Sequence, residues 1–193
     1  MTLPPSEDPI DKPVAATIQL LARQGFDATS VEELAEASGM SRSTFFRRFG
    51  SKEDVVFADH ERTLRQVNER LAGSRLEPLS AVADAALLVF DHHLRNPDTS
   101  RARYGLLQAV PALRDRELVT SHRYERAFLQ YLNDKLPQEA HDVQDGQGGQ
   151  PGYKAVAFAA AVVAVHNAFL RQWLRAVPQA ETTAGTDRDR AAT

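Results

Sequence analysis

Three serines most strongly constrain the fold of this chain, because each is placed to begin a short helix. Ser30, Ser41 and Ser51 are good N-cap residues, and Glu33 follows Ser30 at the spacing of a capping box. Between the first two helices, residues 37–40 read Ala-Ser-Gly-Met, and the glycine can take the positive φ of a tight turn. Two short helices joined by such a turn are typical of the helix-turn-helix motif.

The second of these short helices has two different faces. Phe45 and Phe49 lie four residues apart on one side, which predicts that both are buried. The opposite side carries the residues that suit the major groove of DNA, namely Arg42, Ser43, Phe46 and Arg47. Lys52 stands at the start of the third helix, where its ammonium group and the free backbone amides suit a phosphate oxygen.

The charge of the whole chain argues against a nucleic-acid partner, since the formal net charge is −3 and the pI is about 6.1. Between Ser38 and Lys52, however, there are four basic residues and no acidic one. Such a run is usually a solvated face, and alone it would predict nothing more. Together with the turn, the caps and the buried aromatic residues, it favours a helix that reads DNA.

The rest of the sequence also has helical spacing, without the alternating β-branched runs that are typical of strands. We expect an all-α fold with helices near residues 12–25, 31–37, 42–48, 52–73, 79–96, 98–109, 112–136 and 152–177. The predicted domains are a disordered tail (1–11), a helix-turn-helix DNA-binding domain (12–58), a helical effector-binding and dimerisation domain (59–178) and a second disordered tail (179–193).

Several classes of function are disfavoured. The chain has no cysteine, so a thiol nucleophile and sulfur-ligated metal centres are excluded, and we expect no metal or cofactor. The motifs of serine hydrolases, nucleotide-binding loops and zinc proteases are absent, so we expect no enzyme. The first residues do not resemble a signal peptide, and the longest apolar run, Ala155–Val165, is shorter than the roughly 20 residues of a membrane helix. We therefore expect a cytoplasmic protein without a membrane partner.

The segments Gly25–Ala35 and Gly39–Glu53 resemble the DNA-binding domain of the TetR family of transcriptional regulators. The resemblance implies a homodimer that binds a palindromic double-stranded DNA operator, usually as a repressor, and that a small-molecule effector releases. It also implies phosphate contacts from Thr29, Ser41, Thr44 and Lys52, and it agrees with groove contacts from Arg42, Ser43, Phe46 and Arg47.

The sequence departs from the family pattern in two places. Family members often have Tyr where this chain has Phe46, and many carry a basic run before the first helix, where this chain has Glu7, Asp8, Asp11 and Lys12. Both departures predict weaker binding to non-specific DNA. They also leave open an alternative function, a helical protein-interaction module that has lost DNA binding.

The helix expected at 152–177 is apolar on nearly every side, so it must be buried on more than one. A central helix of a monomeric bundle would meet this condition. We prefer a helix that packs against its twin, because a reader of a palindrome needs two copies. The predicted dimer interface comprises Phe158, Ala161, Val162, Val165 and Phe169.

The candidate effector pocket consists of polar or aromatic residues on otherwise apolar helices, namely Phe90, His93, Tyr104, Gln108, Tyr124, His166, Asn167 and Trp173. Each of these is more often an ordinary core or interface residue. His92 and His93 are adjacent, so both cannot easily face one metal ion. A buried His166–Asn167 pair needs hydrogen-bond partners. It marks either a ligand contact or, as we prefer, a hydrogen bond across the dimer.

Overall fold

The serine caps form as expected. In the computed structural model, which describes residues 11–136 and 152–176, the Ser30 hydroxyl accepts from the Glu33 amide, and the Glu33 carboxylate accepts from the Ser30 amide at 2.7 Å. Ser41 and Ser51 each accept from the amide three residues further on. Gly39 has a φ of +68°, so the turn between the first two of these helices uses the left-handed region that favours glycine.

All regular structure in these described residues is helical, which confirms the all-α fold class. The helices are α1 (Asp11–Gln24), α2 (Val31–Ala37), α3 (Arg42–Phe49), α4 (Lys52–Val55), α5 (Ala58–Ala72), α6 (Pro78–Arg95), α7 (Pro97–Ala109), α8 (Pro111–Lys135) and α9 (Tyr153–Arg175). The predicted C-terminal tail and nearly all of the predicted N-terminal tail lie outside the described residues, and the tails therefore stay predictions.

The single helix expected at 52–73 is divided into α4 and α5. The break lies at Val56 and Phe57, and these two side chains and Val55 are all buried in the same apolar core. Consecutive side chains of one straight helix point about 100° apart, so three in a row cannot face one core. The bend between α4 and α5 turns all three inward.

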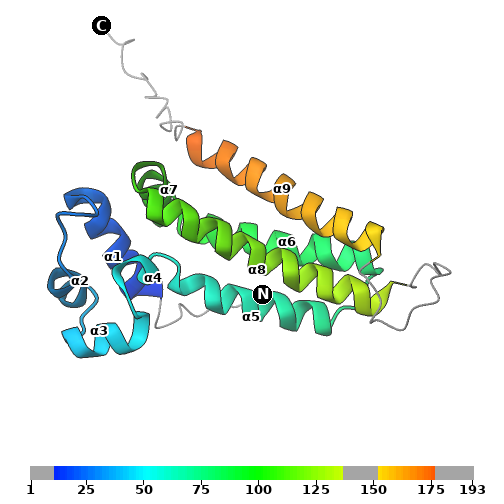
Figure 1. Cartoon of the computed structure of the whole chain (residues 1–193), viewed down its shortest axis with the longest axis horizontal. Coiled ribbons are helices and arrows are strands. Elements are labelled where there is room, and N and C mark those ends of the chain that lie inside the picture. Colours follow the sequence, from blue (N-terminus) through cyan, green and yellow to red (C-terminus); the bar gives the residue numbers. More distant parts are fainter. Residues whose placement is uncertain (1–10, 137–151, 177–193) are drawn as a thin grey trace, which may run out of the picture.

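The helices form two apolar cores, which lie toward opposite ends of the molecule (Figure 1). The first core lies beneath α1–α4 and contains Ile18, Leu34 and Phe45. It also contains Leu106, Leu107 and Leu113, which come from α7 and the start of α8. The second core is built by α5, α6, α8 and α9. Because side chains from both halves of the chain build the first core, a domain boundary at residue 58 stays a prediction.

Helix α9 lies on the outside of the bundle, against α8 and α6 (Figure 1). Its outer side exposes large apolar side chains, with Val165 54% and Phe169 64% exposed. Phe158 and Val162, predicted in the same interface row, instead pack against the second core. The dimer interface stays a prediction. Of its residues, Ala161, Val165 and Phe169 lie on the exposed side of α9, and Phe158 and Val162 lie on the side packed against the second core.

Among the described residues, α9 is also the helix long and apolar enough to cross a membrane by length and composition alone, with a mean hydropathy of 1.5 over its best window. The apolar run Ala155–Val165 lies inside this helix, and the polar pair His166–Asn167 ends the run. Only 11% of the window is buried in the single chain. The described residues therefore leave most of this apolar surface uncovered.

Candidate nucleic-acid interface and internal cavity

Helix α3 has one buried aromatic face and one exposed polar face, as the sequence predicts. Phe45 and Phe49 are buried, and their rings meet edge to face at 5.0 Å between centroids. The outward face carries the predicted groove-facing residues Arg42, Ser43, Phe46 and Arg47, of which Phe46 is 39% exposed. The buried aromatic pair fixes the rotation of α3 about its axis, so this face points away from the core.

The hydroxyl groups at the start of α3 form a small cluster. Ser41 donates a hydrogen bond to the Thr44 hydroxyl at 2.9 Å, and the Ser43 hydroxyl lies 3.1 Å from that of Ser41. Ser41 and Ser43 are exposed and Thr44 is half-buried. Hydroxyls at a helix N-terminus, beside its free amides, are suited to a phosphate oxygen.

Arg42 is held by weak contacts in the free protein. Its Nε lies 2.5 Å from Oε1 of Glu32, and its guanidinium lies over the Phe46 ring, 5.2 Å from the centroid. Both charged side chains are more than 60% exposed. Since an ion pair this exposed contributes little to stability, a phosphate group can displace Glu32 at small cost.

Two of the predicted phosphate contacts are engaged inside the protein. Nζ of Lys52 donates to the backbone carbonyls of Phe26 at 2.6 Å and Thr29 at 3.1 Å, and it lies over the Phe26 ring. The Thr29 side chain is 2% exposed, and its hydroxyl donates to the Gly25 carbonyl at 2.8 Å. In the DNA-free protein, Lys52 and Thr29 thus hold the α1–α2 connection in place, and their contacts with phosphate stay predictions.

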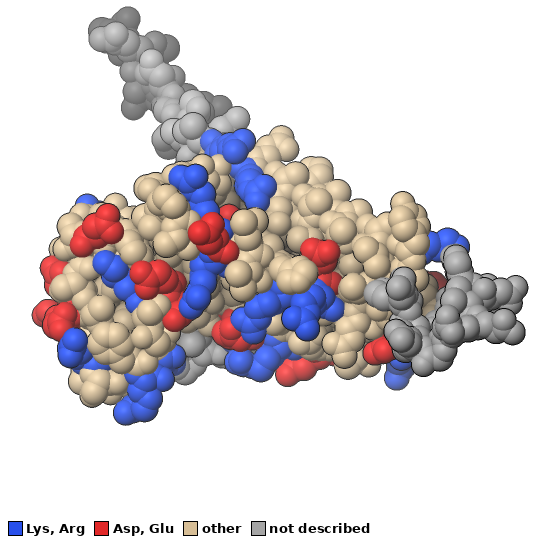
Figure 2. All heavy atoms as spheres, viewed as in Figure 1, with Lys and Arg blue, Asp and Glu red and all other residues tan. Residues whose placement is uncertain are grey.

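The surface near α3 carries both signs of charge. Figure 2 shows Lys and Arg side chains gathered at the tip of the molecule where Figure 1 places α3, with acidic side chains farther along the same end. The exposed basic residues of this helix are Arg42, Arg47 and Arg48. The exposed acidic residues on neighbouring α2 include Glu32 and Glu36. Positive charge is therefore concentrated on α3.

A cavity of about 70 Å³ lies among α5–α9. Five residues of the predicted pocket line it, namely His93, Tyr104, Tyr124, His166 and Asn167. The Asn167 amide donates to the Ser121 hydroxyl at 3.5 Å, and burial lowers the pKa of His166. The preferred interpretation of His166–Asn167 as a cross-dimer contact is therefore corrected, because both side chains face a cavity inside one chain.

Three residues of the predicted pocket do not line the cavity. The Phe90 ring packs edge to face against the rings of His166 and Trp173, and Trp173 lies beneath the Arg101 guanidinium. Gln108 is exposed. Phe90 and Trp173 thus support the wall behind the cavity, and Gln108 faces solvent.

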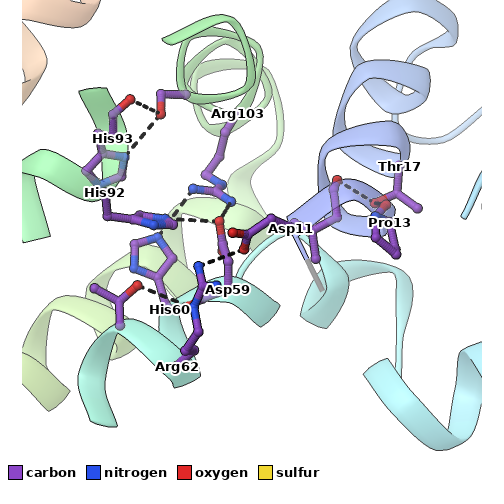
Figure 3. A network of polar contacts seen from close by, with 12 residues as sticks. Asp11, Pro13, Thr17, Asp59, His60, Arg62, His92, His93 and Arg103 are labelled. Atoms are coloured by element: carbon purple, nitrogen blue, oxygen red, sulfur yellow. Dashed lines mark hydrogen bonds and ion pairs between the residues drawn. The ribbon is translucent and has the colours of Figure 1, made fainter. Parts of the chain in front are cut away.

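A buried polar network that the sequence pattern did not predict adjoins this cavity (Figure 3). Its centre is Asp59 on α5, whose Oδ2 accepts from Arg103 of α7 at 2.5 Å and lies 3.1 Å from Nε2 of His92 on α6. Burial opposes the negative charge of Asp59, but the Arg103 guanidinium and the His92 hydrogen bond hold its pKa well below the usual value. A buried carboxylate with these partners stays ionised and ties three helices together.

His60 joins this network to the cavity. Its Nδ1 lies 3.1 Å from the Tyr124 hydroxyl, and its Nε2 lies 3.5 Å from the Arg103 guanidinium, which can only donate. Nε2 is therefore the acceptor and Nδ1 carries the proton. Burial lowers the pKa of His60 to about 3, and the positive charge of Arg103 acts in the same direction. His60 is thus a neutral side chain at the inner end of the cavity.

Asp59, His60 and His92 place potential ligand atoms within 4.8 Å of one another. Oδ2 of Asp59, the oxygen that also faces His92, already forms an ion pair with the Arg103 guanidinium. A fixed positive charge at that oxygen repels a divalent cation, so the donor set fits an ion pair better than a metal ion.

A second ion pair continues the network toward α1. Nη2 of Arg62 on α5 donates to Oδ1 of Asp11 at 2.7 Å, as Figure 3 shows. Asp11 lies in the segment that the sequence analysis assigned to a disordered tail, and the structure corrects this by placing it at the start of α1. The ion pair joins α1 to the same helix that carries Asp59 and His60.

Comparison with known proteins gives a consistent result. Residues 14–58 match the family model described as bacterial regulatory proteins, tetR family. The HTH-type transcriptional regulator TcmR of Streptomyces glaucescens is 30% identical over 109 residues, which are 56% of this chain and 40% of that protein. The HTH-type transcriptional regulator EthR of Mycolicibacterium smegmatis is 28% identical over 116 residues, 58% of this chain and 54% of that protein. The matches thus cover about half of these relatives or less.

A solved structure shows the same fold over most of the chain. It is that of NalD, the secondary repressor of the MexAB-OprM multidrug efflux pump in Pseudomonas aeruginosa, with a TM-score of 0.50 and 20% identity. The match covers 84% of this chain and 85% of that one. Together with the helix-turn-helix geometry of α2 and α3, these findings identify residues 14–58 as a DNA-binding segment of the tetR type, on a chain with the fold of NalD.

Proposed function

We propose that this protein is a DNA-binding transcriptional regulator in which α3 reads the major groove. The observation that carries the proposal is the outward face of α3, where Arg42, Ser43, Phe46 and Arg47 point away from a buried Phe45–Phe49 pair. Exposed arginines and short polar side chains on such a helix are the groups that contact base edges and phosphates. The match of residues 14–58 to the tetR family model supports the same function.

The proposed active form is a cytoplasmic homodimer bound to a palindromic operator. The exposed apolar side of α9, with Val165 and Phe169, supports a self-complementary contact with a second copy. Leu118 and Val119 on neighbouring α8 are also exposed apolar side chains. Two copies would present two α3 helices to two half-sites. We propose repression, with a small molecule in the cavity releasing the DNA.

The test is binding of the full-length protein to a duplex selected from a random pool, measured by fluorescence anisotropy over a range of salt concentrations. We expect the affinity to fall with salt, because Lys and Arg contacts release counterions from the phosphates. In the Arg47→Ala variant, the ratio of specific to random affinity should fall about 10- to 100-fold, the usual value for a lost base contact.

Arg75→Ala is the matched control, because Arg75 is an exposed arginine on the α5–α6 connection, far from α3 (Figure 1). Its loss removes the same charge and should leave the ratio unchanged. Absence of binding at low salt, or binding that ignores salt, would overturn the proposal and favour the protein-interaction alternative.

A further inference from the structure

The inner end of the cavity is unusual because three imidazole rings meet there. The ring centroids of His60, His92 and His93 lie 5.3–5.6 Å apart from one another. His60 and His93 line the cavity, and Ser100 and Tyr124 line it beside them. The proposed function requires only that an effector binds in this cavity. The arrangement of the rings allows the chemical class of that effector to be inferred.

The hydrogen bonds of His93 fix which of its nitrogens is available. The Ser100 hydroxyl donates to the backbone carbonyl of His93 at 3.1 Å, so its oxygen accepts from Nδ1 of His93 at 3.3 Å. A neutral ring with its proton on Nδ1 has a lone pair on Nε2. In the part of the chain that the structure describes, Nε2 of His93 has no hydrogen-bond partner. A polar group that enters the cavity can therefore donate a proton to this nitrogen.

The negative charge that acts on His93 is the Asp59 carboxylate, and it already balances the positive charge of Arg103. It does not balance a second positive charge on His93. Asp59 of α5 is already paired with Arg103 of α7 and accepts from His92 of α6. The other neighbours, His60 of α5, Tyr124 of α8 and His166 of α9, are uncharged. Burial and the neighbouring imidazoles and guanidinium lower the pKa of His93. The Asp59 carboxylate acts in the opposite direction but does not outweigh these effects, and an anion that enters the cavity would add negative charge that stabilises a proton on His93.

We propose that the cavity binds a small organic acid with an apolar body, and that its acid group forms an ion pair with His93 after one proton reaches Nε2. The proton comes from the acid itself or, when the ligand enters as its anion, from solvent. The apolar lining includes Val89, Phe128, Val163 and Leu170, which suit a hydrocarbon chain or ring. The volume of about 70 Å³ restricts the ligand to a small molecule.

Other ligand classes fit the same residues less well. An amine would bring a positive charge toward Arg103 and would find the Asp59 carboxylate already occupied. A neutral alcohol can donate to Nε2 of His93, but it leaves the ring uncharged and takes up no proton. The remaining charged residues of the lining, Glu117 and Arg171, carry opposite signs and give no net preference.

The experiment uses benzoate and hexanoate as acids, with benzyl alcohol and benzamide as neutral ligands of similar size. Binding to the full-length protein is measured by titration calorimetry between about pH 6 and pH 8, in buffers of different ionisation enthalpy. We expect the acids to bind with uptake of one proton. Their Kd should rise about tenfold for each unit of pH over this range, as linkage to one proton requires. The neutral ligands should bind more weakly and take up no proton.

His93→Asn tests the assigned residue, because the Asn amide retains a donor to Ser100 and loses the basic nitrogen. We expect loss of the proton uptake and of the pH dependence. His122→Asn is the matched control, since His122 is exposed on α8 and should leave both unchanged. In the wild-type protein, the ¹⁵N signals of His93 should change to those of an imidazolium when benzoate binds. This measurement does not depend on the folding of a variant.

The proposal is overturned if neither acid binds, if the acids bind without proton uptake, or if the His93→Asn variant keeps the uptake while the wild-type ring stays neutral. Its failure is distinguishable from failure of the proposed function, because calorimetry and NMR need no DNA. If acids bind with the expected proton uptake but do not change operator binding, the site is supported and the effector role is wrong.

Discussion

Lys52 joins the start of α4 to the connection between α1 and α2, through two carbonyl oxygens and the Phe26 ring. Lys52→Met keeps the apolar stem and removes the ammonium group. We expect it to lower the free energy of unfolding by about 1–2 kcal/mol, the usual size of a part-buried charged hydrogen bond. Urea unfolding measures this loss, and Lys135→Met, at the exposed end of α8, is the control. Unchanged stability together with weaker DNA binding would instead support a phosphate contact.

His60 makes the stability of the protein sensitive to acid. Its pKa is about 3 in the folded chain and about 6.5 in an unfolded one. Below pH 6.5 the unfolded chain takes up a proton that the folded chain does not, so stability falls as the pH falls toward 3. His93 and His166 act in the same direction, because burial lowers the pKa of both.

The His60→Asn variant removes one of these protons and keeps a donor toward Tyr124. We expect the slope of unfolding free energy against pH to fall by about 1.4 kcal/mol per pH unit between about pH 6 and pH 4. Urea unfolding at a series of pH values measures the slope. An unchanged slope would show that His60 is protonated in the folded protein. The His122→Asn variant, with its exposed ring, should keep the wild-type slope.

The helix starts could be predicted from the sequence because a cap is a local signal. Ser30, Ser41 and Ser51 each bond to an amide only three residues away. The network around Asp59 has no such signal, since its partners His92 and Arg103 are 33 and 44 residues away in the chain. His93 could be singled out as a polar residue on an apolar helix, but its contact with Ser100 depends on how α6 and α7 pack.

At the level of the element, the role of the turn between α2 and α3 can be tested by comparing two glycines. Gly39 lies in the turn, and Gly105 lies within helix α7. Gly39 has a positive φ, and a methyl group there would meet no atom within 4 Å. We expect Gly39→Ala to destabilise the protein by about 1–2 kcal/mol, through backbone strain alone. Gly105→Ala, in the exposed middle of α7, also meets open space and should stabilise it by about 0.5–1 kcal/mol. Thermal unfolding of both variants measures the difference, and equal effects would contradict the role assigned to the turn.

The elements that the sequence predicted least well are those shaped by packing. The break between α4 and α5 carries no Gly or Pro at Val56–Phe57, so no local signal announces it. Two of the five residues predicted for the α9 interface, Phe158 and Val162, face inward for a related reason. The helix is apolar on nearly every side, and only the positions of α6 and α8 decide which side is covered.

At the scale of the whole molecule, helix α7 contacts both the first apolar core and the cavity. Leu107 lies in the first core, with side chains of α1 and α3, and it also lines the cavity. Ser100 and Arg103 of the same helix join the cavity to the buried ion pair of Asp59. A ligand that displaces α7 therefore acts on the packing beneath the DNA-binding helices, without any contact of its own to them.

The last prediction concerns the assembly of two chains. Phe169 is 64% exposed on the outer side of α9, and Val165, one turn before it, is 54% exposed. A charge placed between two apolar helices is buried without a partner, so we expect Phe169→Glu to convert a dimer into a monomer. Sedimentation equilibrium measures the mass. Leu76→Glu, at a leucine 53% exposed on the α5–α6 connection, adds the same charge and should leave the dimer intact. If the Phe169→Glu variant stays dimeric, the two copies meet through another surface, and the spacing of the two α3 helices must be derived from that surface instead.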